Sequence, residues 1–244
     1  MPRAICIHGA WQGSWSWKKL VSTLEGSDVL IDALDLPGNG TDDTLPEAVT
    51  LDVYVGHVLR RVALDDSKVW LIAHSGAGII ASQVAETVPH RIAGILYIAG
   101  MMLPSGQTYA GLVTTCSAVE PAAGGVGPYL QWSPDRLTSC VPPEAARRFF
   151  FQDADPGDAA WATARLTPQP EGGRAVRASL TSGRFGQVRR VYLETLHDRS
   201  VLPGMQRRMQ AAMPGALAVA LPTGHCPQLV APRAVADIVQ SLVR

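Results

Sequence analysis

Short apolar runs alternate along the chain with segments of helical period. The runs carry no charged residue and predict strands buried on both faces, as in a parallel sheet; they are 4–7, 29–31, 69–73, 95–99, 191–193 and 216–221. Apolar residues recur every three or four positions from Leu51 to Ala63, which predicts an amphipathic helix with Thr50 as its N-cap. The same period marks a C-terminal helix that starts at Pro232. This alternation predicts an α/β fold with helices on both faces of an open parallel sheet.

The stretch 103–187 interrupts the alternation. It contains Gly/Pro clusters at 121–127 and 168–173, and its clearest helical patches are 142–153 and 155–165. A structureless loop of this length inside a compact domain is improbable. We therefore expect residues 1–102 and 188–244 to form the core and residues 103–187 to form a cap inserted over the carboxyl edge of the sheet.

Composition excludes several classes of function. The 244 residues contain 21 Lys plus Arg and 21 Asp plus Glu, with no basic cluster that would bind nucleic acid. The longest apolar run, 92–103, has 12 residues, too few to span a bilayer, so no membrane association is expected. The four cysteines form no CxxC motif, and no HExxH motif is present, which argues against a metal site. Because no secretory signal is recognisable, reduced thiols and a cytoplasmic location are expected.

The segment 73–78 carries the clearest chemical motif, and it reads AHSGAG. It follows a predicted strand and opens a predicted helix, the context of a nucleophile elbow that would expose the Ser75 hydroxyl. It departs from the GxSxG pattern because Ala73 and Ala77 replace the outer glycines. Two other interpretations remain: Ser75 as a helix N-cap, and 76–81 as a dinucleotide fingerprint. The fingerprint lacks the acidic residue that should end the next strand.

A nucleophilic serine needs a base and an acid that orients it. Asp198 follows the fifth predicted strand, and His225 follows the sixth. The order Ser75, Asp198, His225 is that of α/β-hydrolases. Two other acids fit less well, since Asp35 precedes the serine and Glu194 lies inside a strand.

The loop after the first strand is the candidate for the second half of an oxyanion hole. A tetrahedral oxyanion requires two N–H donors, and we expect them from Ala10 and Gly76. Gly9 lets the backbone bend toward the site. Trp15 and Trp17, in the same segment, are expected to pack the first helix on the sheet.

An uncharged stretch from residue 92 to residue 119 favours an apolar pocket and a neutral ester with an aromatic or alkyl group. The apolar side chains of this stretch could equally well pack the cap on the core. Lactones, thioesters and amides would use the same machinery. The residues expected to contact substrate are Gly9, Trp11, Met101, Met102, Leu103, Trp132, Phe150 and Trp161.

These motifs together resemble the branch of α/β-hydrolases that contains plant methylesterases, hydroxynitrile lyases and small bacterial esterases. The resemblance rests on the segments 7–17, 73–78, 198–203 with 206–209, and 224–225. It implies a mostly parallel six-stranded sheet with an inserted cap, no cofactor and no metal, and a serine hydrolase that acts on a small ester through an acyl-enzyme.

Lyases of this branch carry a threonine directly after the early-loop histidine and a lysine after the catalytic histidine. Here those positions are Gly9 and Cys226, which favours hydrolysis. Lyase-like C–C cleavage and ligand binding without turnover stay as alternatives. The oligomeric state, monomer or homodimer, stays open.

Overall fold

The computed structural model describes residues 1–243 and contains one six-stranded sheet. Every neighbouring pair of strands is parallel, and the order is β2-β1-β3-β4-β8-β9. The predicted α/β class and sheet are thereby confirmed. The strands are β1 (Arg3–Ile7), β2 (Leu30–Leu34), β3 (Val69–His74), β4 (Ile92–Ile98), β8 (Arg190–Thr195) and β9 (Leu217–Leu221).

Most strands extend beyond the apolar runs that predicted them, and in β2 and β8 the added residues include an acid whose charge is paired. Asp32 in β2 accepts hydrogen bonds of 2.9 and 2.6 Å from Arg61. Glu194 in β8 lies 2.7 Å from an Arg207 nitrogen. A partner on a neighbouring helix offsets the penalty of placing a charge in a strand.

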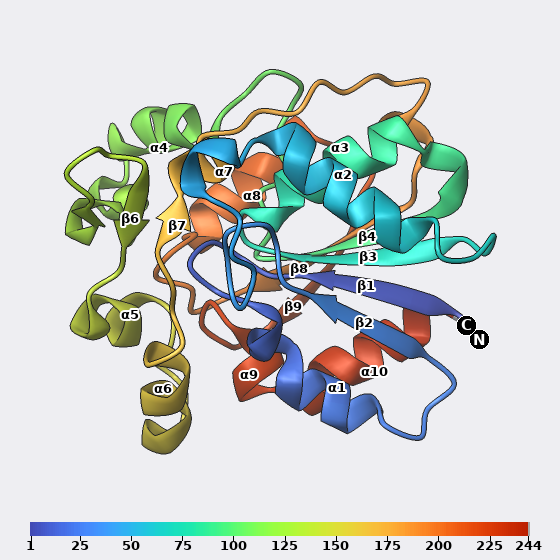
Figure 1. Cartoon of the computed structure of the whole chain (residues 1–244), viewed down its shortest axis with the longest axis horizontal. Helices are drawn as coiled ribbons and strands as arrows, with labels where there is room; N and C mark the ends of the chain where they lie inside the picture. Colours follow the sequence, from blue (N-terminus) through green and yellow to red (C-terminus); the bar gives the residue numbers. More distant parts are fainter. Residues whose placement is uncertain (244) are drawn as a thin grey trace.

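Helices cover both faces of the sheet (Figure 1). One face carries α1 (Lys18–Leu24) and α10 (Pro232–Val243); the other carries α2 (Leu51–Val62), α3 (Ala77–Thr87) and α8 (Pro203–Ala212). The predicted N-cap is confirmed, since Thr50 Oγ1 accepts a hydrogen bond of 3.3 Å from the Val53 N–H. The remaining core elements are η1 (Ser14–Trp17), η2 (Pro46–Ala48), η3 (Pro89–Arg91) and α9 (Pro227–Val230). Within residues 1–243, no helix is both long enough and apolar enough to cross a bilayer.

Most of the residues 103–187, hereafter the cap segment, lie beside the carboxyl ends of the strands (Figure 1). The last part of the segment runs back along α3, where Thr181 and Arg184 donate hydrogen bonds to Glu86. Helices α5 and α6 are shorter than the predicted patches 142–153 and 155–165. A small antiparallel sheet, in the order β5-β6-β7, was not predicted because strands of two or three residues show no period. The elements are α4 (Tyr109–Ser117), η4 (Pro121–Gly124), η5 (Gly127–Tyr129), β5 (Gln131–Trp132), β6 (Thr138–Cys140), α5 (Pro143–Phe149), α6 (Pro156–Thr163), β7 (Gln169–Pro170), α7 (Glu171–Arg174) and η6 (Phe185–Gln187).

The order of the strands predicts a crevice at the carboxyl ends of β1 and β3, where the sequence predicts the active site. From β1 the chain proceeds to β2 on one side and then crosses to β3 on the other. At such a switch point the loops leaving β1 and β3 diverge, and ligands of open α/β sheets bind at the carboxyl ends there. The loop 8–13 and the turn at Ser75 follow these two strands.

Candidate active site

Ser75 lies in a strained turn between β3 and α3. Its φ of +53° belongs to the left-handed region that side chains rarely occupy. The turn is held by hydrogen bonds from the Ser75 N–H to the Ile98 carbonyl (3.1 Å) and from the Met101 N–H to the Ser75 carbonyl (2.8 Å). A Cβ at Gly78 would lie 2.6 Å from the Met101 nitrogen, so only glycine allows this approach. The N-cap of α3 is Gly76, and no side chain caps this helix, which removes the N-cap interpretation of Ser75.

Asp198 and His225 form a buried pair on the neighbouring loops. His225 Nδ1 lies 2.8 Å from Asp198 Oδ2. The same carboxylate accepts hydrogen bonds from the Thr195 hydroxyl (2.9 Å) and from the N–H groups of Ser200 (2.7 Å) and Val201 (2.9 Å). Both side chains of the pair are almost completely buried. The Gln206 amide adds a longer hydrogen bond of 3.5 Å, so four donors besides the imidazole fix the acid, and its position fixes the ring.

The rival acids have other partners. Glu194 pairs with Arg207, as described above. Asp35 accepts hydrogen bonds from the Ser14 N–H (2.5 Å) and from the Thr41 hydroxyl (2.8 Å). Partial burial acts to raise the pKa of Asp35, but these hydrogen bonds outweigh it and lower the pKa. Asp35 thus holds a loop, and neither acid reaches His225.

Two further histidines near the site are neutral and structural. Burial lowers the pKa of His8 to about 4, and its Nε2 accepts a hydrogen bond of 3.0 Å from the Leu36 N–H. Burial, followed by the neighbouring His225, lowers the pKa of His74 well below the usual range. His74 Nε2 lies 2.8 Å from the His225 carbonyl, which only accepts, so Nε2 carries the proton. His74 therefore fixes the backbone of His225.

A cavity of about 660 Å³ opens over these residues. Ser75 and His225 both line it, so the structure brings the predicted nucleophile and base to one space. Of the predicted oxyanion and substrate residues, those that line the cavity are Gly9, Ala10, Trp11, Gly76, Met101 and Phe150.

Four of the residues expected to contact substrate do not line this cavity. Met102 and Leu103 are buried in the core against the sheet. Trp161 packs edge-on against Trp15 with ring centroids 5.5 Å apart, and Trp132 is 38% exposed on β5. None of the four lines the cavity. The contact with Trp161 also corrects the prediction for Trp15, whereas Trp17 packs between α1 and the sheet as expected.

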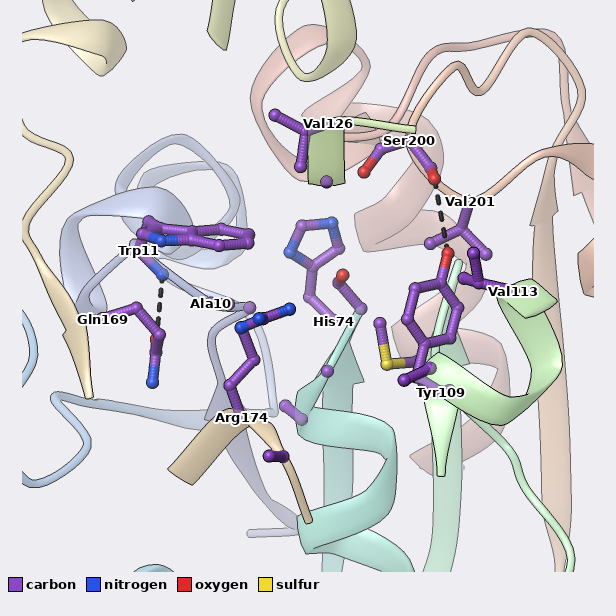
Figure 2. A pocket seen from close by; sticks show the side chains of 18 of the residues that line it. Ala10, Trp11, His74, Tyr109, Val113, Val126, Gln169, Arg174, Ser200 and Val201 are labelled. Carbon is purple, nitrogen blue, oxygen red and sulfur yellow. Dashed lines mark hydrogen bonds between the residues drawn. The ribbon is translucent and has the colours of Figure 1, made fainter. Parts of the chain in front are cut away.

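The loop after β1 (residues 8–13), hereafter the oxyanion loop for its predicted role, is held by the cap segment. A Cβ at Gly9 would lie 2.9 Å from His74 Nδ1 and 3.0 Å from Ser75 Cβ, which explains the glycine. Trp11 has a φ of +63°, and its N–H donates to Gln169 Oε1 at 3.0 Å (Figure 2). The Trp11 carbonyl accepts from the Thr167 N–H at 2.9 Å. The backbone that follows Ala10 is therefore fixed.

Several residues of the cavity wall were not predicted. They come from α2, α3, the cap segment and the loop after Asp198, and include Tyr54, Ile80, Tyr109, Val113, Val126, Gln169, Arg174, Ser200 and Val201. The cap residues among them are marked by no sequence pattern, because the cap segment has no sustained period that would tell an inward side chain from an outward one. Tyr54 and Ile80 lie on predicted helices, but the sequence does not show which turn of each helix reaches the cavity.

A model of the alpha/beta hydrolase family matches residues 4–238. The chain belongs to this family. Methylesterase 7 of Arabidopsis thaliana is 29% identical over 217 residues, covering 84% of this chain and 82% of that protein. Salicylic acid-binding protein 2 of Nicotiana tabacum is 29% identical over 214 residues, covering 83% and 82%. A pyrethroid hydrolase from Sphingobium faniae JZ-2 has the same fold, with a TM-score of 0.88, 24% identity and coverage of 99% and 97%.

These matches confirm the predicted resemblance of this alpha/beta hydrolase to the methylesterase branch. Because relatives over most of its length are esterases by name, the chain is an enzyme of the carboxylic ester hydrolase class.

Proposed function

We propose that this alpha/beta hydrolase cleaves esters through Ser75, His225 and Asp198. One observation carries the proposal: the strained Ser75 turn and the buried His225–Asp198 pair meet at a single cavity. Ser75 Oγ attacks the ester carbonyl while His225 Nε2 accepts the hydroxyl proton. Asp198 accepts the hydrogen bond from Nδ1–H and stabilises the imidazolium. His225 then protonates the leaving alcohol, and a water activated by His225 releases the acid.

The N–H groups of Ala10 and Gly76 are proposed to bind the oxyanion. Both residues line the cavity, on the two loops that flank Ser75. Within residues 1–243, neither N–H has an intramolecular acceptor, so both are free to donate to a ligand. Removing one such donor from a serine hydrolase costs about 10²–10³-fold in rate.

The proposed substrate is a small ester with an apolar body. The cavity wall is largely aliphatic and aromatic, with Ile80, Met101, Val113 and Phe150 among its residues. The names of the relatives support an ester over a lactone, thioester or amide as the first substrate to test.

Lyase chemistry is disfavoured by the residue that follows His225. Burial raises the pKa of the Cys226 thiol, so it carries no charge that could stabilise a cyanide leaving group. Its sulfur is 3.4 Å from the amide nitrogen of Gln12.

Labelling with a fluorophosphonate tests the proposed nucleophile. This reagent phosphonylates only an activated serine, and we expect one adduct per chain, on the peptide that contains Ser75. Mass spectrometry of the digested protein measures it. Heat-denatured protein, which has lost the His225–Asp198 pair, is the control. The absence of an adduct on the native protein would favour ligand binding without turnover.

Gln169 is expected to act as a positioning residue for the oxyanion loop. Replacing Gln169 by Leu removes the acceptor of the Trp11 N–H, and should lower kcat about 10–100-fold with KM changed less than about threefold. A boronic acid, which forms a tetrahedral adduct with the nucleophile, should lose affinity in parallel with kcat.

The matched control is Gln131→Leu. Gln131 lies in the same small sheet, and its side chain is exposed. This variant should behave as wild type in both measurements. If Gln169→Leu binds the boronic acid as tightly as wild type does, the loop holds its shape without this contact.

A further inference from the structure

One permanently charged side chain lines the cavity, and it is Arg174. Among residues 1–243, the wall holds no other Arg or Lys and no carboxylate. Arg174 is the last residue of α7 and follows the strand that carries Gln169. Figure 2 shows it reaching into the cavity close to Ala10 and Trp11, on the side of the oxyanion loop.

The guanidinium of Arg174 is held rigidly from behind. Its Nε donates to both carboxylate oxygens of Glu171 (2.8 and 2.9 Å), and Nη2 lies 2.8 Å from Glu171 Oε2. Glu171 in turn accepts a hydrogen bond of 2.6 Å from the Ser139 hydroxyl. The guanidinium carbon lies 5.7 Å from the Trp11 ring centroid and 5.6 Å from that of Trp132. A side chain fixed in this way loses little entropy when a ligand binds.

Nη1 is the nitrogen of the Arg174 guanidinium that can donate hydrogen bonds to a ligand. Within residues 1–243 its two N–H groups have no acceptor, whereas Nε and Nη2 both lie against the Glu171 carboxylate. The charge of Arg174 is already balanced by Glu171, so a second carboxylate at Nη1 would face an existing anion at short range. A neutral oxygen acceptor fits better, and a carbonyl presents two lone pairs in the plane that guanidinium donors prefer.

We propose that Arg174 determines specificity by binding a second, neutral carbonyl group of the substrate. The substrates would then be esters with an apolar body that also carry a ketone, aldehyde or amide oxygen several bonds from the ester. The inference rests on the proposed function, because the cavity is taken as the place where the ester is cleaved. Trp132 lies outside the cavity, and in this proposal it acts on the substrate only indirectly, by holding the Arg174 guanidinium.

Two matched pairs of esters test the inference on the acyl and alcohol sides. The acyl pair is p-nitrophenyl pentanoate and p-nitrophenyl 4-oxopentanoate; the alcohol pair is pentyl acetate and 4-oxopentyl acetate. Each pair differs only by one ketone oxygen. Each kcat/KM is divided by the rate of alkaline hydrolysis of the same ester, which removes the inductive effect of the ketone.

For wild type we expect the keto ester of at least one pair to be preferred by about tenfold or more, as for a hydrogen bond to a charged donor. Arg174→Met should abolish this preference, because the rate on the keto ester should fall by about tenfold more than the rate on the alkyl ester. Because this change leaves Glu171 without its partner, the double variant Glu171→Gln with Arg174→Met is measured as well. The control is Arg165→Met: this exposed arginine stacks on Trp161 away from the cavity, and its loss should leave the preference intact.

The outcomes separate the two proposals. If wild type hydrolyses none of the four esters, the proposed function fails. If it hydrolyses the alkyl esters without preferring either keto ester, or if the preference survives in the folded Arg174 variants, only the role of Arg174 is overturned. A stronger preference for the anionic mono-p-nitrophenyl glutarate than for the 4-oxopentanoate would overturn the requirement for a neutral acceptor.

Discussion

Replacing Ser75 by Ala is expected to lower kcat for p-nitrophenyl butyrate by at least about 10⁴-fold. In the proposed mechanism the Ser75 hydroxyl attacks the ester carbonyl, His225 accepts its proton, and the Ala10 and Gly76 N–H groups bind the oxyanion that results. Loss of the hydroxyl leaves only the acceleration that the oxyanion donors and binding give to attack by water. Initial rates under saturating substrate measure the effect, and the fluorophosphonate adduct should vanish with the activity.

The fold should survive this change. The hydrogen bonds of the turn are made by the backbone of Ser75, and alanine keeps the same Cβ at the positive φ. The melting temperature should therefore stay within a few degrees of wild type. Ser67→Ala is the control, because Ser67 lies before the opposite end of β3 and is exposed. Wild-type rates in Ser75→Ala would refute the assignment of the nucleophile.

Replacing Asp198 by Asn is expected to lower kcat by about 10³–10⁴-fold with little effect on KM. The amide oxygen can still accept from the Ser200 and Val201 N–H groups, so the loop keeps its shape. The amide nitrogen then replaces Oδ2 beside His225 Nδ1. It donates where the carboxylate accepted, and the imidazole must place its proton on Nε2. In that tautomer His225 cannot take the proton of Ser75.

Glu194→Gln provides the matched control for Asp198→Asn. Glu194 lies on the same strand end but pairs with Arg207. Its replacement should leave kcat within about twofold of wild type, at some loss of stability from the broken ion pair. Equal losses of activity in the two variants would show that the effect of Asp198→Asn is one of folding and not of tautomer control.

The chemistry of the strand ends could be predicted from the sequence because it depends on local patterns. A buried parallel strand is continuously apolar, and the residues that follow it lie at the carboxyl edge whatever the rest of the chain does. Ser75 and Asp198 follow the buried strands β3 and β8, and His225 follows β9, an edge strand that is continuously apolar in sequence although largely exposed. Their order and position therefore pointed to one site. The same reasoning predicted Ala10 and Gly76 as oxyanion donors, because they lie in the loops that follow β1 and β3.

The cap segment could not be predicted in this way. Its strands have two or three residues and its helices four to nine, so no period separates the inner from the outer face. Aromatic residues were taken as pocket walls on composition, and Trp132 and Trp161 proved to lie outside the cavity. Met102 and Leu103 were misplaced for a related reason: the chain turns back toward the sheet directly after Met101, and no residue type signals that turn.

The six-stranded sheet and the three loops that carry Ser75, Asp198 and His225 thus follow from local patterns in the sequence. Which cap residues line the cavity depends on the packing of the whole chain. Trp11 meets Ser139 across 128 residues and Gln169 across 158, and Arg174 reaches the cavity only because Glu171 and two indole rings orient it. Contacts between residues more than 100 positions apart depend on the packing of the whole chain, so local sequence patterns do not predict them.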